Sequence, residues 1–393
     1  MTQRHSDSLS IKATLLGVST LTVMAGATIA PSLPEMRTQF ADVANADYLV
    51  RLVLTLPALF IVIGSPIAGL TIDRFGRKPL LVAAVLLYGL AGSSGFFLQQ
   101  LGSILVGRAL LGLAVGAIMT SATTLIADYY LGPARAYFLG LQAAFMGLGG
   151  VLFLTLGGWL ADIDWHMPFL IYLFALLLLP FVGLVLYEPV RSRGSTDRMD
   201  NPSTALPVKL LVVVYGAAIL TQIIFYMIPV QLPFYLQSLT GATASQSGLA
   251  IALMTLSSSI ASIGYGRVKG RFDFVSILML VFLLIGTGYV LIGWLRSYEQ
   301  ILIGLVISGL GLGLLMPNLT VWVSSVVPDV LRGRALGGLT TFFFLGQFLS
   351  PFFSQPLADR IGLDKTYMVA GGLLLVLALI ISIGRRSAAA MAR

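Results

Sequence analysis

Long apolar stretches alternate with short polar segments along almost the whole chain. Each stretch has about 20 or more mainly apolar residues, the length that an α-helix needs to cross the hydrocarbon core of a bilayer. Charged residues, Gly and Pro mark the ends of the stretches. We therefore predict an all-α membrane protein with twelve transmembrane helices. The predicted spans are residues 13–34, 49–70, 79–99, 102–127, 136–161, 166–187, 209–236, 244–265, 274–295, 299–326, 333–357 and 366–385.

The longest polar interruption divides the twelve spans into two sets of six. It runs from Glu188 to Pro207 and is rich in Ser, Arg, Asp and Pro, a composition typical of a flexible linker. We predict an N-terminal six-helix bundle over residues 1–187, a cytoplasmic linker over 188–208 and a C-terminal six-helix bundle over 209–393.

The two halves resemble each other in sequence. At a constant offset of 197 residues and without a gap, residues 104–162 align with residues 301–359. The register holds through two spans and the loop between them, which indicates a duplication. Two parallel six-span repeats are one architecture of secondary transporters, with the binding site between the halves. The less common matches are Gly112, Gly116, Met119, Arg135, Gly140 and Asp162 with Gly309, Gly313, Met316, Arg332, Gly337 and Asp359, in that order.

Composition indicates that lipid is the solvent for most of the chain. Hydrophobic residues make up 57% of the chain and charged residues only 10%, whereas a soluble domain has about 25% charged residues. Of the 24 Lys and Arg residues, 18 fall on one side of the predicted membrane. This asymmetry follows the positive-inside rule, so we predict a protein of the cell inner membrane with both termini in the cytoplasm. The net charge of +8 then reflects topology, and we predict no nucleic-acid partner.

The segment after the second predicted span indicates a family. It reads Gly69-Leu70-Thr71-Ile72-Asp73-Arg74-Phe75-Gly76-Arg77-Lys78. This segment closely resembles the cytoplasmic loop signature of the major facilitator superfamily, G-x-L-x-D-R-x-G-R-K/R. A degraded copy, residues 264–271, lies at the corresponding place in the second half. The resemblance implies a secondary transporter with two pseudo-symmetric six-helix bundles, closest to the drug:proton antiporter branch.

The resemblance and the residue chemistry together predict a cytoplasmic latch between the halves, formed by Gly69, Asp73, Arg77, Asp128 and Arg135. Gly69 permits the close approach of another helix, and Asp73 can face the positive N-terminus of span eleven. Arg77 can pair with Asp128, and Arg135 lies in the adjacent loop. We expect this cluster to break when the transporter opens inward. The alternative is a solvated loop whose ion pairs contribute little stability.

One arginine lies inside a predicted span. Arg108 shares a helix face with Gly112 and Gly116 in span four, which is similar to a second motif of the superfamily. A lone guanidinium within the membrane is costly and marks a candidate functional site. The alternative is that Arg108 hydrogen-bonds buried backbone carbonyl groups and only braces the neighbouring spans.

Two features depart from the proton-coupled drug exporters of the superfamily. The Gly-Pro of their fifth-span element is missing before Gly157-Gly158, and no Asp or Glu lies at the centre of a predicted cavity-lining span. A proton-coupled carrier needs a group whose charge can change as access alternates, and a buried carboxylate is the usual choice. Proton coupling therefore depends on the resemblance and not on particular residues.

Uncharged polar and aromatic side chains within the spans predict the substrate pathway. A cavity of aromatic rings, methionines and single amides suits a hydrophobic or amphipathic solute. Gln142 and Gln347 are further amides within spans five and eleven. The predicted substrate-binding residues are Arg108, Met24, Thr124, Gln222, Tyr226, Asn318 and Trp322.

We predict a monomeric secondary active transporter that moves such a molecule by alternating access, as in drug or metabolite efflux. A uniporter or importer of an organic solute, without proton antiport, remains an alternative. A membrane-embedded enzyme would need clustered carboxylates or a membrane-facing His, which the spans lack, so we predict no enzyme. The chain has no cysteine and no phosphate-binding Gly-x-x-x-x-Gly-Lys-Ser/Thr run, and we predict no cofactor and no metal.

Overall fold

The computed structural model describes residues 8–189 and 207–391, and these residues form helices and no strand. Twelve helical spans are long and apolar enough to cross a membrane, which confirms the predicted all-α fold. Most spans extend several residues beyond their predicted ends, because hydropathy does not detect the polar first and last turns of a helix. Of the predicted linker, residues 190–206 lie outside the described part of the chain.

The first six spans are α2 (Leu9–Ala27) with η1 (Ala30–Ser32) and α3 (Leu33–Gln39), α4 (Ala46–Phe75), α5 (Arg77–Ser93) with η2 (Ser94–Phe96), α6 (Leu101–Tyr129), α7 (Gly132–Ala161), and η3 (Met167–Leu173) with α8 (Phe174–Val185). The other six are α9 (Val208–Phe225) with α10 (Met227–Thr240), α11 (Ala244–Lys269), α12 (Phe274–Trp294), α13 (Tyr298–Val326), α14 (Asp329–Ile361) and α15 (Leu363–Met391).

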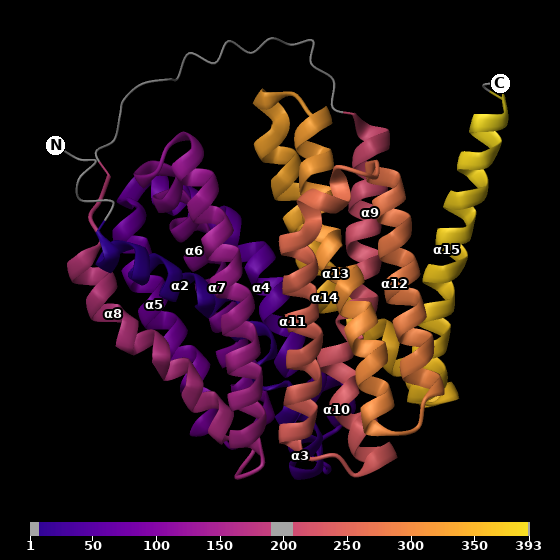
Figure 1. Ribbon diagram of the computed structural model, residues 1–393. Coiled ribbons are helices and arrows are strands. Elements are labelled where there is room, and N and C mark those ends of the chain that lie inside the picture. Colours follow the sequence, from indigo (N-terminus) through magenta and orange to yellow (C-terminus); the bar gives the residue numbers. More distant parts are fainter. Residues whose placement is uncertain (1–7, 190–206, 392–393) are drawn as a thin grey trace.

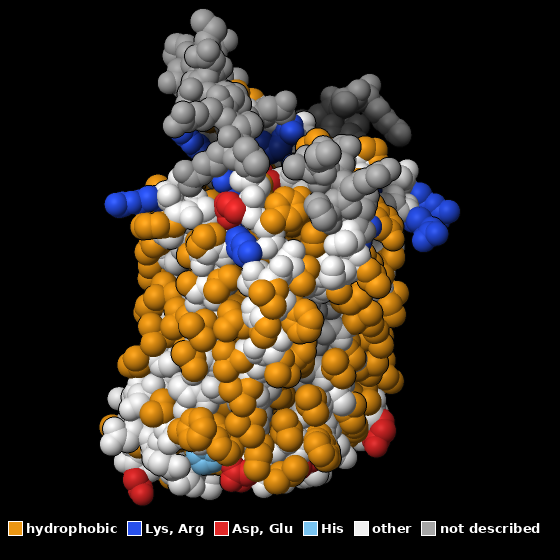
Figure 2. All heavy atoms as spheres, turned by 90° about the vertical axis from the view of Figure 1, so that its left-hand side faces the viewer, with side chains coloured by type: hydrophobic (Ala, Val, Ile, Leu, Met, Phe, Trp, Pro, Cys, Tyr) orange, Lys and Arg blue, Asp and Glu red, His pale blue; other side chains and the backbone are white. Residues whose placement is uncertain are grey.

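The two sets of six spans form two bundles that stand side by side (Figure 1). Helix α2 begins, α8 ends and α9 begins at the same end of the molecule, at the top of Figure 1. We call this the connector end, and we call the opposite end, where α3 and α10 end, the far end. Apolar side chains cover the middle of the face in Figure 2, and most Lys and Arg on that face lie toward the connector end. An apolar middle with basic residues toward one end is the distribution expected of a protein whose middle faces lipid.

The seventh span is broken between α9 and α10. Pro229 has no N–H to donate to the carbonyl oxygen of Phe225, so the helix is interrupted there. Tyr289 of α12 donates to the carbonyl oxygen of Ile224 at 2.7 Å and also lies 3.2 Å from that of Phe225, and Tyr367 of α15 donates to the carbonyl oxygen of Met227 at 3.1 Å. The ninth and twelfth spans thus satisfy the backbone groups around the break.

The first span is built in the same way. It changes from α2 through η1 to α3 near Pro31 and Pro34. Tyr88 of α5 donates to the carbonyl oxygen of Leu21 at 2.7 Å, and Tyr172 of η3 lies 3.4 Å from that of Ala25. In each half, tyrosines of the third and sixth spans therefore support the first, as a duplication predicts.

Repeated glycines allow two equivalent helix contacts. A Cβ atom at Gly112 of α6 would lie 2.4 Å from the carbonyl oxygen of Pro57 in α4. A Cβ atom at Gly309 of α13 would lie 2.5 Å from that of Met254 in α11. Because both contacts are backbone on backbone, only glycine fits, and both pairs are 197 residues apart in the sequence.

Candidate functional site

The two halves touch from the middle of the molecule to the far end. In α7 and α11, a Cβ atom at Gly147 would lie 2.4 Å from the Ser259 hydroxyl, and one at Gly158 would lie 3.2 Å from the Cα atom of Gly248. Toward the connector end the halves separate. Cβ atoms at five glycines of α7, α11 and α14 would have nothing within 4 Å there: Gly140, Gly264, Gly266, Gly333 and Gly337.

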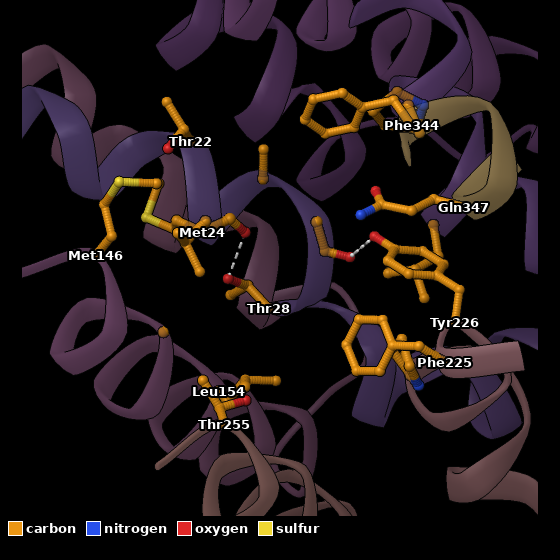
Figure 3. Close-up of a pocket in the computed structure, with 18 of the residues that line it drawn as sticks. Thr22, Met24, Thr28, Met146, Leu154, Phe225, Tyr226, Thr255, Phe344 and Gln347 are labelled. Carbon is orange, nitrogen blue, oxygen red and sulfur yellow. Dashed lines mark hydrogen bonds between the residues drawn. The ribbon is translucent and has the colours of Figure 1, made fainter. Parts of the chain in front are cut away.

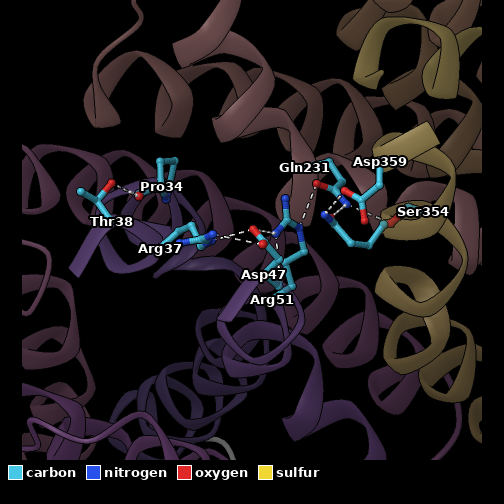
Figure 4. A network of polar contacts seen from close by, with 9 residues as sticks. Pro34, Arg37, Thr38, Asp47, Arg51, Gln231, Ser354 and Asp359 are labelled. Atoms are coloured by element: carbon cyan, nitrogen blue, oxygen red, sulfur yellow. Dashed lines mark hydrogen bonds and ion pairs between the residues drawn. The ribbon is translucent and has the colours of Figure 1, made fainter. Parts of the chain in front are cut away.

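A buried arginine joins the halves at the far end (Figure 4). Arg51 of α4 is 5% exposed, and its Nε donates to Gln231 Oε1 of α10 at 3.0 Å. Its guanidinium also lies over the ring of Phe234, 4.2 Å from the centroid. Within its own half, Nη1 donates to the Asp47 carbonyl oxygen at 2.7 Å. Arg37 forms an ion pair with the Asp47 carboxylate at 2.6 Å.

Gln231 continues the network into α14. Its Nε2 donates to Ser354 Oγ at 3.2 Å and to Gln355 Oε1 at 3.0 Å. Gln355 Nε2 in turn donates to Asp359 Oδ1 at 2.8 Å. An unbroken chain of polar contacts therefore runs from the first half of the molecule to the end of α14, and we call it the far-end network.

A second polar contact crosses the halves nearby. The backbone N–H of Ser245, at the start of α11, donates to Asp162 Oδ1 at 3.2 Å, and the Ser245 hydroxyl donates to the same carboxylate. Asp162 follows the last residue of α7. The carboxylate therefore lies at the positive N-terminus of a helix from the other half.

A cavity of about 400 Å³ lies between the halves, in the middle of the molecule. Both bundles line it, through α2, α4, α6 and α7 on one side and α9, α10, α11, α13 and α14 on the other. The described lining has no charged residue and no histidine. It includes aromatic rings and five methionines: Met24, Met119, Met146, Met254 and Met316. Met119 and Met316 occupy equivalent positions of the repeat, so the cavity lies on the pseudo-symmetry axis.

Most hydroxyl groups of the lining are already bonded. Each lining threonine donates to a carbonyl oxygen of its own helix, which is the usual arrangement in apolar surroundings. Tyr226 donates to the Gly26 carbonyl oxygen at 3.1 Å, and so crosses between the halves (Figure 3). Gln347 Nε2 donates to Gln222 Oε1 at 3.2 Å. The threonines are Thr22, Thr28, Thr255 and Thr340.

Three of the predicted substrate-binding residues lie at the cavity or directly behind it. Met24 and Tyr226 belong to its lining. Gln222 is fully buried behind Gln347, which lines the cavity.

Arg108 lies outside the lining and is 1% exposed. Its Nε donates to the Val53 carbonyl oxygen at 2.9 Å, and its Nη2 donates to that of Ala25 at 2.8 Å. Its guanidinium lies 5.1 Å from the centroid of the Tyr172 ring. Arg108 therefore connects the first, second, fourth and sixth spans, and its Nη1 has no hydrogen-bond partner among the described residues.

The other three predicted residues also lie outside the lining. The Thr124 hydroxyl donates to the Thr120 carbonyl oxygen at 2.8 Å. Asn318 donates to the Phe274 carbonyl oxygen at 3.0 Å, and Trp322 stacks on the Phe274 ring at 5.6 Å between centroids. Thr124 thus bonds within its own helix, whereas Asn318 and Trp322 connect two helices of one bundle. A helical face read from sequence does not show which neighbour it meets.

The predicted latch residues lie at the connector end and, within residues 8–189 and 207–391, form no hydrogen bond or ion pair with the other half. Arg77 and Asp128 form an ion pair at 3.1 Å within the first bundle. A Cβ atom at Gly69 would have nothing within 4 Å. The side chains of Asp73 and Arg135 are exposed. The backbone N–H of Arg77 instead donates to Glu188 Oε1 at 2.9 Å, and that of Lys78 donates to Oε2 at 2.7 Å.

Sequence reasoning missed most of the lining of α7, α11 and α14. Met146, Met254 and Phe344 are ordinary apolar residues of membrane helices, and no local pattern separates them from lipid-facing neighbours. The repeat offers one signal, because Gly150 and Gln347 are equivalent positions and both line the cavity.

Comparison with known proteins identifies the family to which this twelve-span chain belongs. The sequence profile of the Major Facilitator Superfamily matches residues 15–351 and, in a second match, residues 214–391. The chain belongs to the Major Facilitator Superfamily. It is therefore a membrane transporter and not an enzyme, and general secondary transport is its activity.

Known relatives span nearly the whole facilitator chain. The tetracycline resistance protein, class H, of Pasteurella multocida is 24% identical over 334 residues, covering 82% of each chain. The bacillibactin exporter of Bacillus subtilis is 25% identical over 365 residues, covering 86% of this chain and 87% of the exporter. Among solved structures, a D-xylose-proton symporter superposes with a TM-score of 0.81 at 17% identity, covering 95% of this chain and 96% of the symporter. That likeness supports the fold alone.

Proposed function

We propose that this facilitator exports a hydrophobic or amphipathic small molecule by alternating access. The supporting observation is the apolar cavity of about 400 Å³ at the interface of the two bundles, which is large enough for a drug-sized solute. One relative is named for tetracycline resistance and another as a bacillibactin exporter, and both names support the outward direction.

We further propose that the connector end faces the cytoplasm of a bacterial cell, because Lys and Arg gather there. In that orientation the described structure is open inward and closed outward. The far-end network is the outer gate, and residues Gly69, Asp73, Arg77, Asp128 and Arg135 form an inner latch that engages in the opposite state. Bundles over residues 1–187 and 209–393 rock about the cavity as a monomer.

Met24, Tyr226 and Gln347 are the substrate contacts that the cavity supports best. Arg108 acts from behind the lining, where it holds the backbone of α2 in place and supplies a buried positive charge. For Thr124, Asn318 and Trp322, whose contacts lie within one bundle, we propose a part in helix packing.

Transport without proton antiport is the second candidate. The described lining has no Asp, Glu or His, and therefore no group whose charge could change in the range of pH 5 to 8. This observation favours a uniporter or an importer of an organic solute. Antiport requires that carboxylates away from the cavity, such as Asp47 or Asp359 of the far-end network, take up the proton.

Flux measurements in proteoliposomes separate these functions. Purified protein is reconstituted with a pH-sensitive dye inside, and hydrophobic fluorescent compounds are screened for movement across the membrane. Gly150→Trp should abolish movement, because Gly150 lines the cavity and its Cβ atom would already lie 3.0 Å from the Val23 side chain and 3.2 Å from that of Thr255. Gly183→Trp is the matched control, since a Cβ atom there meets nothing within 4 Å.

A proton flux in the direction opposite to that of each transported compound supports antiport. Transport without proton flux supports the second candidate. If Gly150→Trp transports as well as the unaltered protein, the cavity is not the substrate site.

A further inference from the structure

Gln347 differs from every other polar group of the cavity. It is the one lining side chain, among the described residues, that offers a donor and an acceptor on separate neighbouring atoms. One N–H of its amide is bonded to Gln222. The rest of the amide has no hydrogen bond to a described residue, and it points into the space next to Tyr226 (Figure 3).

Gln222 holds this amide in place from behind. It is fully buried, and α9 and α14 are in close contact there, because a Cβ atom at Gly346 would lie 2.7 Å from the Cβ atom of Gln222. The Nε2 of Gln222 is buried and has no hydrogen-bond partner among the described residues. Buried amide groups are rarely left unpaired. Gln222 thus lies out of reach of a molecule in the cavity, and the free part of the Gln347 amide is the hydrogen-bonding capacity that a bound molecule can complete.

The charges around the cavity disfavour a cation. No carboxylate lies in the described lining, so a positive ligand would be buried without a counter-ion. The nearest buried charge is positive, since Arg108 donates at 2.8 Å to the carbonyl oxygen of Ala25, itself a lining residue. Among the described residues, no ion pair neutralises Arg108. Its field is felt strongly because the surroundings are apolar.

The aromatic rings of the lining favour a cation, but by less than the missing counter-ion disfavours it. Phe225, Phe343 and Phe344 line the cavity and could attract a cation through their π-faces. That attraction is smaller than the cost of moving an unpaired charge from water into an apolar cavity. The rings instead provide flat walls for an aromatic ligand, and the methionines adapt to its outline.

We propose that the cavity selects uncharged aromatic compounds that present a carboxamide-like pair of donor and acceptor, that Gln347 binds this pair, and that lipophilic cations are rejected. This inference rests on the proposed function, because it takes the cavity to be the substrate site. Primary amides have the required edge.

Three probes of similar shape test the proposal: naphthyl carboxamide, isopropylnaphthalene and naphthyl trimethylammonium. Equilibrium dialysis against the purified full-length protein measures their affinities. We expect the carboxamide to bind about tenfold or more tightly than the other two, as one good hydrogen bond between uncharged groups in an apolar site provides. Gln347→Leu should remove this preference. Gln142→Leu, which removes an amide that bonds to Ser19 outside the lining, should keep it.

Gln347→Glu reverses the charge selection while keeping the side-chain shape. It should bind naphthyl trimethylammonium at least tenfold more tightly than the unaltered protein does. Melting temperatures identify variants that fail to fold, and the Leu and Glu variants give independent readings. If the cation binds the unaltered protein as tightly as the carboxamide, or if Gln347→Leu keeps the preference, the proposal is wrong while the cavity remains a binding site. If no probe binds and Gly150→Trp transports normally, the proposed substrate site is wrong as well.

Discussion

The far-end network makes a quantitative prediction for Gln231. Gln231→Leu removes the acceptor of the Arg51 Nε donor, and it also removes the bonds to Ser354 and Gln355. Leucine keeps the apolar volume of the side chain. The Nε donor of Arg51, a residue only 5% exposed in the closed far end, then lacks its hydrogen-bond partner from the other half, while the contact with the Phe234 ring remains.

The magnitude follows from the cost of an unpaired buried donor. A buried group that loses its partner costs about 1–3 kcal/mol, and more when it is charged. In the state open at the far end, water solvates Arg51, so the cost falls on the closed state alone. A loss of about 2–3 kcal/mol shifts the equilibrium between closed and open far ends about 30- to 150-fold toward open, at 1.4 kcal/mol per factor of ten.

Distances between spin labels measure this equilibrium directly. The chain has no cysteine, so Asp42→Cys in the first half and Thr240→Cys in the second give two labels at the far end without background. Both positions are exposed. Pulsed electron resonance should show a short distance in the parent and a longer, more populated distance in Gln231→Leu.

Two further variants serve as controls. Arg51→Leu combined with Gln231→Leu removes the unpaired Nε donor together with its acceptor, and should restore part of the short distance. Arg37→Ala breaks an ion pair within one half and should leave the distribution unchanged. If Gln231→Leu and its parent give the same distribution, the network does not hold the far end closed.

Three other predictions concern stability, each checked by thermal unfolding in detergent. Tyr289→Phe leaves the carbonyl oxygens of Ile224 and Phe225, at the break of span seven, without their shared donor, and should lower stability by about 1–3 kcal/mol; an unchanged melting temperature would contradict this account of the break. Gly309→Ala forces a Cβ atom to 2.5 Å from a backbone oxygen and should destabilise by about 1–3 kcal/mol, whereas Gly183→Ala should be neutral; equal effects would argue against the glycine contact. Glu188→Gln weakens two hydrogen bonds to the N-terminus of α5 and should cost about 0.3–1 kcal/mol, and a stabilised variant would refute that role.

The fold was predictable from sequence because its causes are local. The topology can be predicted without knowledge of contacts from three features: the twelve apolar stretches, the internal register of 197 residues and the segment from Gly69 to Lys78. The helix breaks were less accessible. Pro229 suggests one, but the support that Tyr289 and Tyr367 give it depends on which spans become neighbours.

The cavity could be predicted only in outline. Its polarity followed from the residue types within the spans, and Met24 and Tyr226 were among the predicted residues that line it. Asn318 and Trp322 share a helix face with the polar and aromatic side chains expected of a substrate pathway. Asn318 nonetheless donates to the Phe274 carbonyl oxygen in the adjacent helix, and Trp322 stacks on the Phe274 ring. Helical periodicity shows that side chains share a face, but it does not show whether that face meets a neighbouring helix, lipid or a cavity.

The far-end network was also hidden in the sequence. The four-residue spacing of Asp47 and Arg51 is consistent with the local pair that they form, at 3.8 Å, but it gives no sign that Arg51 also bonds to Gln231, 180 residues away. Contacts of such separation depend on how the two bundles dock, and docking changes with the transport cycle. A single sequence therefore does not specify one set of contacts between the bundles.

Locking the halves together at the far end tests alternating access most directly. Asp162→Cys with Ser245→Cys places two thiols where a carboxylate and a hydroxyl now hydrogen-bond across the halves, in a chain that has no other cysteine. Substrate flux is measured in proteoliposomes after oxidation and again after reduction. Alternating access predicts that oxidation abolishes transport and that reduction restores it, with each single-cysteine variant unaffected. Undiminished transport by the fully cross-linked protein would contradict the mechanism.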